Sequence, residues 1–380
     1  MDHDDTKESY YDAGRYDTAA GWDGTSRGKK ADPPPPRKAP LFALAGEEEV
    51  GLSTRPLKPL FGDLWGEREI AVLAGETGVG KSVLTVQLAE LLARGRLSPT
   101  LSPKRVIYVD FEHTTSQFED RYCSPRRPGH TARRVRFQFS KKFQRVVPRF
   151  DQTPEKKFGR DVGRYFCNEL GRAIDEFDAH IAIVDNLSFL MMGGGGSRAA
   201  EQAMLALRLI TRTFTYPVSI LVTACLRDRR VPRPIELRDL ACSSRIAELA
   251  DSVFALGRST AGDDLRYLKH LKSRTAALTL TGQNTPVLRL SRLAEPPSIT
   301  NAGFTPDGSL STTRHLQLTA GSPLPFLGLT HIGFSDESVH IYDPVKQAQL
   351  DDREVRRKLR RSENIVEIVM SPEYQRYLNR

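Results

Sequence analysis

The amino-acid sequence predicts an α/β fold in which helices flank both faces of a mostly parallel β-sheet. Short apolar runs, typical of buried strands, alternate along the chain with longer segments whose apolar residues recur at helical spacing. The segments between successive apolar runs are long enough for the crossover connections that parallel strands require. In sheets of this kind the ligand binds at the carboxyl ends of the strands, so the functional residues are expected there.

The predicted elements follow one another in a regular order. Six apolar runs are expected to form buried strands, and the last two are expected to close the series: residues 69–74, 105–112, 181–186, 219–225, 251–256 and 265–272. Apolar residues spaced three and four apart predict helices between and after these strands: residues 83–95, 114–122, 162–177, 199–214 and 244–250. A glycine run at residues 193–196 and a polar, proline-bearing loop at residues 226–238 interrupt the pattern.

The 380-residue chain is predicted to hold one large domain between two less regular ends. Residues 1–40 are polar, include four consecutive prolines and show no apolar periodicity, so we expect a disordered tail. Residues 41–335 are assigned to the domain, and residues 336–380 to a small, basic helical segment.

Charge and cysteine usage narrow the class of protein. The four cysteines lie at no metal-ligand spacing, and the chain has neither a signal-peptide core nor an apolar stretch long enough to cross a bilayer. We therefore expect a cytoplasmic protein with free thiols and no membrane partner. The formal net charge of +9 is compatible with a nucleic-acid partner.

One strongly basic segment could supply that nucleic-acid contact. Thirteen Lys or Arg side chains lie between residues 121 and 160, against only Asp151 and Glu155, and aromatic residues are interleaved with them. Cations and aromatic rings together are typical of grooves that bind single-stranded nucleic acid. The alternative is a solvated face with core-facing phenylalanines, because residues 135–139 alternate like a half-buried strand.

A glycine-rich loop between the first strand and the first helix is the most specific motif. It fits the pattern G-x-x-x-x-G-K-[ST] with the residues Gly75, Glu76, Thr77, Gly78, Val79, Gly80, Lys81 and Ser82. Glycines allow backbone N–H groups to point inward at phosphate oxygens, and the helix N-terminus adds positive charge. Lys81 would reach the β- and γ-phosphates, and the Ser82 hydroxyl would ligate Mg²⁺. The motif in this context predicts binding of a nucleoside triphosphate, whereas the alternative is a structural turn.

Two further strand ends carry the acids that such a site needs. Asp185 ends the third strand, where a carboxylate would hold Mg²⁺, usually through water, although it could instead cap a helix. Glu112 ends the second strand and is the candidate general base for the attacking water, because this strand is expected to lie near the strand of the glycine loop. Asp110 lies two residues earlier on the same face and competes for this role.

Lys272 and Arg274 end the last predicted strand. Their spacing of two places both cations on one face of the strand. There they could stabilise the transition state on the γ-phosphate of a neighbouring subunit, as an arginine finger does. The alternative, a solvated strand end, is equally compatible with the spacing.

In this order, the motifs resemble those of RecA-like AAA-domain ATPases of the plasmid RepA helicase type, single-domain ATPases of bacterial plasmids and conjugative elements. The resemblance covers about residues 59–335 and is carried by PLFGDLW, the glycine loop, YVDFE, IVDN, DLACSSRIAELADSVFAL and RYLKHLKSR. It implies ATP and Mg²⁺ as ligands, Glu112 as the catalytic glutamate and Asp185 as the metal residue. It also implies Lys272 and Arg274 as the trans-acting pair of a ring-shaped homo-oligomer, with a hexamer among the options.

Two positions depart from the family's pattern. The fourth strand commonly ends in Ala-His, a γ-phosphate sensor, whereas this chain has Ala224-Cys225. A thiol is a poor hydrogen-bond donor to phosphate, which puts the coupling of hydrolysis to movement in doubt. The family's Gly-Ser-Ser is replaced by Cys242-Ser243-Ser244, which is a smaller difference.

Relatives can carry a small helix-turn-helix near the C-terminus. By that resemblance residues 365–372 are a candidate remnant of a helix-turn-helix, although they lack its glycine turn.

The sequence thus predicts a Mg²⁺-dependent ATPase that acts on DNA, preferably single-stranded, as a helicase-like or replication and maintenance protein of a mobile element. The main alternative is a nucleotide-gated DNA-binding or regulatory switch that hydrolyses slowly and unwinds nothing. A small-molecule kinase is a third class, which the Lys-x-Arg strand end and the basic segment disfavour.

Overall fold

The computed structural model describes residues 58–98, 100–125, 134–149, 162–191, 197–227, 233–241, 244–297, 324–341, 349 and 352–353. The chain divides into two compact units, Met1–Arg55 and Pro56–Arg380, and all of these residues belong to the second. The predicted tail at residues 1–40 and the candidate helix-turn-helix remnant at residues 365–372 lie outside the described residues. No helix within the described ranges is long and apolar enough to cross a membrane.

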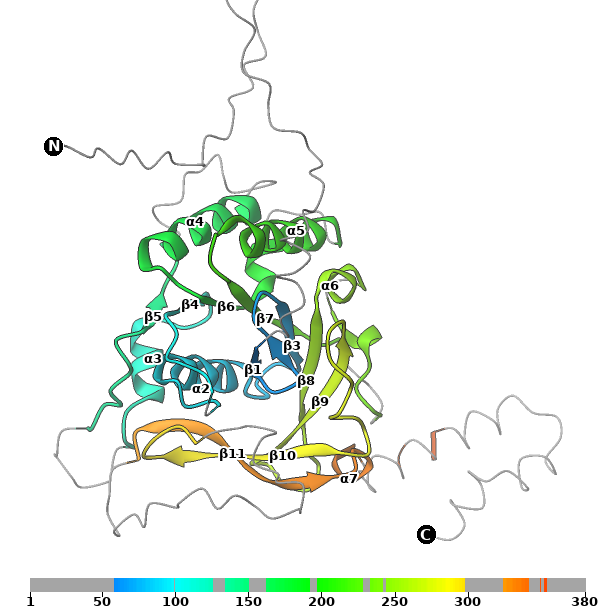
Figure 1. Ribbon diagram of the computed structural model, residues 1–380. Helices are drawn as coiled ribbons and strands as arrows, with labels where there is room; N and C mark the ends of the chain where they lie inside the picture. The colour runs from blue at the N-terminus through cyan, green and yellow to red at the C-terminus, as the bar shows by residue number, and fades with distance from the viewer. Residues whose placement is uncertain are drawn as a thin grey trace, which may run out of the picture. The chain divides into compact units, whose positions relative to one another are not determined.

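A nine-stranded sheet forms the centre of the second unit in the part that the structure describes (Figure 1). From one edge to the other its strands are β11 (Phe326–Ser335), β10 (Thr285–Leu293), β9 (Leu265–Ser273), β8 (Ser252–Arg258), β3 (Ile70–Gly75), β7 (Ser219–Cys225), β6 (Ile181–Asp185), β4 (Val106–Asp110) and β5 (Phe143–Val146). The strands from β8 to β5 are parallel, and β9, β10 and β11 extend the sheet by antiparallel pairing. A separate antiparallel pair consists of β1 (Pro59–Phe61) and β2 (Trp65–Gly66).

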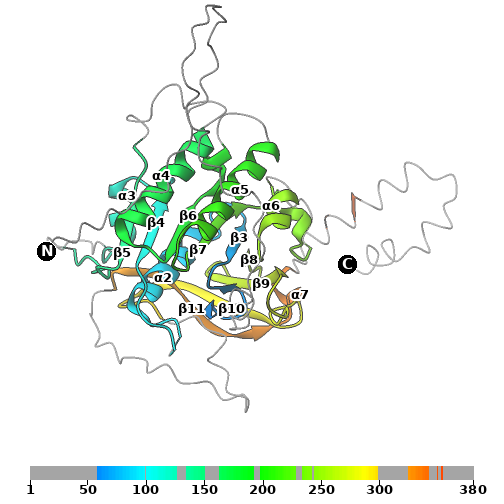
Figure 2. The same cartoon turned by 45° about the horizontal axis from the view of Figure 1, so that its top comes forward.

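Helices cover both faces of this sheet (Figures 1 and 2). One face packs against α2 (Lys81–Arg94), α3 (Thr115–Arg121) and the β1–β2 pair, and the other packs against α4 (Val162–Phe177), α5 (Ser197–Thr213) and α6 (Ser244–Leu249). Alternate residues of each buried strand enter the two cores, as the pleat requires. In β4, for example, Tyr108 joins the α2 side, whereas Ile107 and Val109 join the α4–α5 side.

The predicted α/β class, with a mostly parallel sheet flanked by helices, is confirmed. Each of the six expected strands is present, and the helix expected at residues 162–177 has the same bounds as α4. The expectation that residues 265–272 close the series is wrong, because β10 and β11 continue the sheet beyond β9. Residues 135–139, which alternate like a half-buried strand in the sequence, form no strand in the structure: only Arg136 forms an isolated bridge there, and the edge strand is β5.

Candidate nucleotide site

The glycine-rich loop connects β3 to α2 and has the backbone shape that the motif predicts. All six residues of β3 are buried, so the loop starts from the centre of the sheet. Gly78 and Gly80 have φ angles of 72° and 108°, which side chains with a Cβ rarely tolerate. A Cβ on Gly75 would lie 2.8 Å from Val79 and 2.9 Å from the carbonyl oxygen of Leu256, so this position too requires glycine.

The N-terminus of α2 is open to an anion. Gly80 caps this helix without any side-chain hydrogen bond to its first N–H groups. These donors and the partial positive charge of the helix therefore point toward the space in front of the loop. The nearest described atoms to a Cβ built on Gly78 or on Gly80 are both 3.9 Å away, which leaves room at the loop. These features fit a bound triphosphate.

Lys81 lies in the interior of the loop. The residue is 8% exposed, and Nζ donates hydrogen bonds to the carbonyl oxygens of Gly75 at 2.9 Å and Glu76 at 3.0 Å. Nζ also lies 4.0 Å from the Sγ atom of Cys225 at the end of β7. The ammonium group is thus held between the loop and the neighbouring strand, where a phosphate can replace its carbonyl partners.

The sheet order corrects one expectation about the acids. Strand β3 pairs with β7 and β8, so both β6 and β4 are separated from the glycine loop's strand. Glu112 therefore follows a strand that lies three positions from β3, not beside it. The register still aligns Asp110 with Asp185, so the predicted acids meet at one edge of the sheet.

Asp185 is fully buried and bound on both carboxylate oxygens. Tyr108 Oη donates a 2.6 Å hydrogen bond to Oδ2, and Thr223 Oγ1 donates a 2.5 Å hydrogen bond to Oδ1. Burial, and then the negative charge of Asp185, raise the pKa of Tyr108 well above its ordinary value, so the phenol remains a donor. With both oxygens engaged, Asp185 fits a bound Mg²⁺ through an intervening water, which is how Mg²⁺ commonly meets a carboxylate.

Asp110 is occupied by structural partners. Its Oδ1 accepts hydrogen bonds from the backbone N–H groups of Glu112 at 3.1 Å and His113 at 2.9 Å, and its carboxylate forms a 2.9 Å ion pair with Arg145. Burial opposes ionisation, but the hydrogen bonds from His113 and the nearby charges of His113 and Arg145 together lower the pKa of Asp110. This carboxylate organises the end of β4.

Glu112 is exposed, and one of its carboxylate oxygens is held by the adjacent strand. The side-chain amide of Asn186 donates a hydrogen bond to Glu112 Oε1, while Asn186 Oδ1 accepts from the backbone N–H of Ser188 at 2.8 Å. Sequence reasoning did not assign Asn186, Tyr108 or Thr223 to the site. Two features of the sequence could have indicated these residues. Asn186 directly follows Asp185, and Tyr108 and Thr223 lie near the ends of their strands.

Lys272 and Arg274 lie together, but in this chain they bind the end of α6. Lys272 Nζ donates to the carbonyl oxygens of Ala247 at 2.5 Å and Ala250 at 2.8 Å. Arg274 donates to the carbonyl oxygen of Glu248 and lies 3.3 Å from Asp251 Oδ1, and its side chain is 46% exposed. Burial, and then the charge of Arg274, lower the pKa of Lys272. Both cations thus stabilise the helix C-terminus.

The aromatic residues of the basic segment pack against one another. Phe139 stacks on Phe143 with ring centroids 4.8 Å apart, and its centroid lies 5.2 Å from that of Tyr122. Phe137 packs edge-on against Phe326 of β11 at 4.7 Å. The described rings join the core on the α2 side, so the interpretation as core-facing residues fits them better than a stacking platform for bases.

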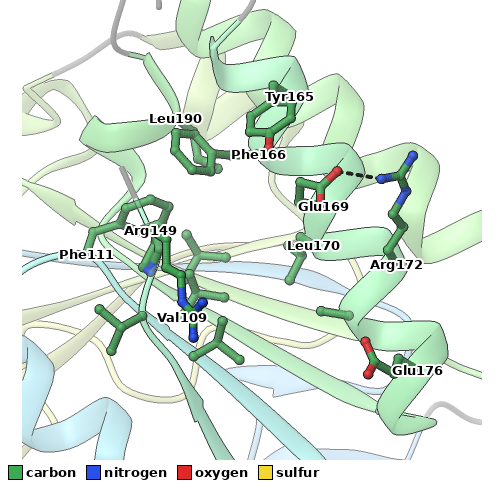
Figure 3. Close-up of a pocket in the computed structure, with 15 residues that line it drawn as sticks. Val109, Phe111, Arg149, Tyr165, Phe166, Glu169, Leu170, Arg172, Glu176 and Leu190 are labelled. Carbon is green, nitrogen blue, oxygen red and sulfur yellow. Dashed lines mark hydrogen bonds and ion pairs between the residues drawn. The ribbon is translucent and has the colours of Figure 1, made fainter. Parts of the chain in front are cut away.

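A separate cavity of about 490 Å³ lies between α4 and the carboxyl ends of β4 and β5 (Figure 3). Val109, Phe111 and Leu190 line its apolar wall, and the rim carries Glu169 and Arg172, which form a 2.9 Å ion pair. No residue of the glycine loop lines this cavity. The loop, with its backbone donors and Lys81, is therefore the candidate nucleotide site.

One protein-family model matches the part of the chain that contains this site. A family model described as an AAA domain matches residues 35–218, a span that contains the glycine loop, Glu112 and Asp185. Among solved structures, the chain is similar to a KaiC-like protein from the hyperthermophilic archaeon Pyrococcus horikoshii, with 13% identity and a TM-score of 0.42 over 64% of this chain and 99% of that chain. No curated protein matches the sequence. Residues 35–218 thus match an AAA domain, and the parallel sheet with its glycine loop and flanking helices has the RecA-like α/β fold of P-loop ATPases.

Proposed function

We propose that this protein hydrolyses ATP with Mg²⁺ and that Glu112 is the general base. The observation that carries the proposal is the difference in environment between two carboxylates at the carboxyl end of β4, those of Asp110 and Glu112. Asp110 is buried and bound by His113 and Arg145, whereas Glu112 is exposed and held by Asn186. A general base must be able to reach a water molecule, which Glu112 can do and Asp110 cannot.

The chain's own residues would act in the following way. The loop N–H groups and Lys81 bind and orient the phosphates. Glu112 accepts a proton from the attacking water, while the side-chain amide of Asn186 holds Oε1 of the Glu112 carboxylate. Mg²⁺ would be held by Ser82 and, through water, by Asp185, and it would neutralise charge on the phosphate oxygens. Thr223 and Tyr108 keep Asp185 oriented.

We further propose the finer assignment to the plasmid RepA helicase type, with Arg274 acting in trans within a ring that binds DNA. The exposure of Arg274 and the net charge of +9 support this proposal. Replication or maintenance of a mobile element is the role that the resemblance suggests. A nucleotide-gated switch without unwinding is the second candidate, because Cys225 stands beside Lys81 where the resembling proteins commonly have histidine.

Two assays test these proposals. ATP turnover with and without single-stranded DNA, together with the mass in solution with ATP, tests hydrolysis, DNA dependence and assembly. Strand displacement on a forked duplex separates the two candidates: unwinding coupled to ATP supports the helicase, and nucleotide-dependent DNA binding without unwinding supports the switch. An unchanged rate with DNA and a monomer with ATP would contradict both the DNA and the ring proposals.

A further inference from the structure

Two arginines approach the glycine loop from β8 and β9. Arg258, the last residue of β8, lies directly opposite Arg266 of β9 in the antiparallel register. Arg258 Nη2 lies 3.4 Å from the carbonyl oxygen of Gly78, and Arg266 Nε donates a 2.7 Å hydrogen bond to the carbonyl oxygen of Val79. The two guanidinium groups therefore contact consecutive carbonyls of the same loop.

This arrangement is electrostatically unfavourable in the chain alone. Like charges directly opposite each other on antiparallel strands destabilise the pair. Arg266 is only 4% exposed, and its other hydrogen bonds go to the backbone carbonyls of Asp263 and Leu265. Burial, and then the charge of Arg258, lower the pKa of Arg266. The charges of Asp264 and Asp263 oppose this shift, but Asp264 forms its ion pair with Arg289 in the part of the chain that the structure describes. An anion at the loop would therefore relieve the repulsion between Arg258 and Arg266.

The position of Arg258 and Arg266 in the sheet indicates which part of a bound nucleotide they face. Strand β3 has β7 on one side and β8 on the other. Cys225, Asp185 and Glu112 all belong to the β7 side, whereas Arg258 stands on the β8 side. If Glu112 acts on the γ-phosphate, as proposed above, the β8 side faces the diphosphate end that ATP and ADP share.

We propose that Arg258 binds the diphosphate moiety of the nucleotide in cis and that Arg266 is a positioning residue for the loop. Arg266 fixes the Val79 carbonyl away from the ligand, so that the N–H groups of the loop point toward phosphate. Arg258 is exposed and can turn from the Gly78 carbonyl onto a phosphate oxygen. This inference rests on the proposed nucleotide site and adds a cation that the loop motif does not contain.

The test is calorimetric titration of the Arg258→Ala full-length chain with ADP, and with ATP in the absence of Mg²⁺. A hydrogen bond to a charged group is worth enough to predict about 10- to 100-fold weaker binding, by the same factor for both nucleotides. Arg289→Ala is the matched control: it removes the same charge from the next strand, where Arg289 pairs with Asp264 at 3.1 Å.

Thermal unfolding distinguishes a role of Arg258 in nucleotide binding from a role in stabilising the fold. Removing one of two opposed like charges should leave the melting temperature of the nucleotide-free protein unchanged or higher, while ADP stabilises the Arg258→Ala variant less than it stabilises the unsubstituted protein. Unaltered ADP affinity in Arg258→Ala, or a lower melting temperature without nucleotide, would overturn the inference. If the unsubstituted chain binds no nucleotide, the proposed function itself fails, which is a distinguishable result.

The positioning role of Arg266 has its own pair of variants. Arg266→Lys keeps the positive charge, whereas Arg266→Met keeps only the apolar stem. We expect Arg266→Lys to retain more ADP affinity than Arg266→Met at similar melting temperatures. Equal affinities in the two variants would overturn the role of the Arg266 charge.

Discussion

Asn186 donates a hydrogen bond from its side-chain amide to the carboxylate of Glu112, which links the ends of β6 and β4. The backbone N–H of Ser188 in turn fixes the amide oxygen of Asn186 at 2.8 Å. The candidate base is therefore oriented by a neighbouring strand and not by its own. A small displacement of a catalytic group can cost about a hundredfold in rate, so this amide is expected to matter for turnover.

Replacing Asn186 should slow hydrolysis without weakening nucleotide binding. For Asn186→Ala we expect turnover to fall by about 10- to 100-fold, because Glu112 loses its orientation, while ATP affinity stays within about twofold. Steady-state ATPase assays and calorimetric titration measure the two quantities. Ser188→Ala is the control, since only the backbone of Ser188 enters the network. Equal rates for Asn186→Ala and Ser188→Ala would remove Asn186 from the mechanism.

The thiol beside Lys81 predicts weak coupling between DNA and hydrolysis. Cys225→His would supply an imidazole donor at the end of β7, 4.0 Å from the ammonium of Lys81 in the native chain. We expect the ratio of ATPase rates with and without single-stranded DNA to rise by roughly tenfold, since one hydrogen bond to a charged phosphate supplies that much. Cys225→Ser, which adds no imidazole, should keep the native ratio. The same ratio in all three proteins would show that this position does not sense phosphate.

We expect substitution of Arg274 to affect catalysis and substitution of Lys272 to affect stability. Arg274→Ala is expected to cut turnover by about 10³- to 10⁵-fold with nearly unchanged affinity, as loss of an arginine finger does. Mixing Arg274→Ala with Lys81→Ala subunits should restore part of the activity, because each supplies what its neighbour lacks. A monomer that hydrolyses at the full rate with ATP and DNA present would contradict sharing of the site.

Lys272→Ala provides the contrast to Arg274→Ala. Lys272 binds the carbonyl oxygens of Ala247 and Ala250 at the end of α6, so its removal leaves these acceptors without their cation. We expect a loss of about 1–3 kcal/mol in the free energy of unfolding, measured by denaturant titration. A stability equal to that of the native chain, with a large loss of turnover, would instead assign Lys272 to catalysis.

Buried histidines predict a stability that falls in mild acid. His340 is 3% exposed, and its Nδ1 lies 2.8 Å from Ser259 Oγ. Burial lowers the pKa of His340 below its ordinary value of 6.5, so between these two values the unfolded chain binds a proton that the folded chain does not. The stabilising contribution is therefore complete above pH 6.5 and decreases as the pH falls below it. Thermal melts across this range should show a shallower decline for His340→Gln, and an unchanged slope would contradict the assignment.

The sequence predicted those elements of the fold that are determined by residues close together in the chain. The strand, glycine loop and helix of residues 70–94 are contiguous, and the helix Val162–Phe177 has a clear helical period. Sheet order depends on pairing between distant segments, so the insertion of β7 between β3 and β6 was not visible in the sequence. Strands β10 and β11 were missed because they pair across a long separation and are only partly buried.

In the candidate site, too, the sequence predicted the residues of a contiguous motif but not the contacts between distant segments. The loop motif located Lys81 and Ser82 directly, but the choice between Asp110 and Glu112 remained open in the sequence. We propose Glu112 because Arg145, 35 residues away, binds Asp110. The hydrogen bonds of Tyr108 and Thr223 to Asp185 likewise come from two different strands, a relationship that no local pattern contains.

The most direct test of the proposed function is the comparison of ATP binding and ATP turnover in Glu112→Gln. Glutamine fills the same space and can still accept from Asn186, but it cannot take a proton from water. We predict that this variant binds ATP as the native chain does and loses turnover by at least about a hundredfold, whereas Lys81→Ala loses binding itself. Normal turnover in Glu112→Gln would contradict the assignment of Glu112 as the general base.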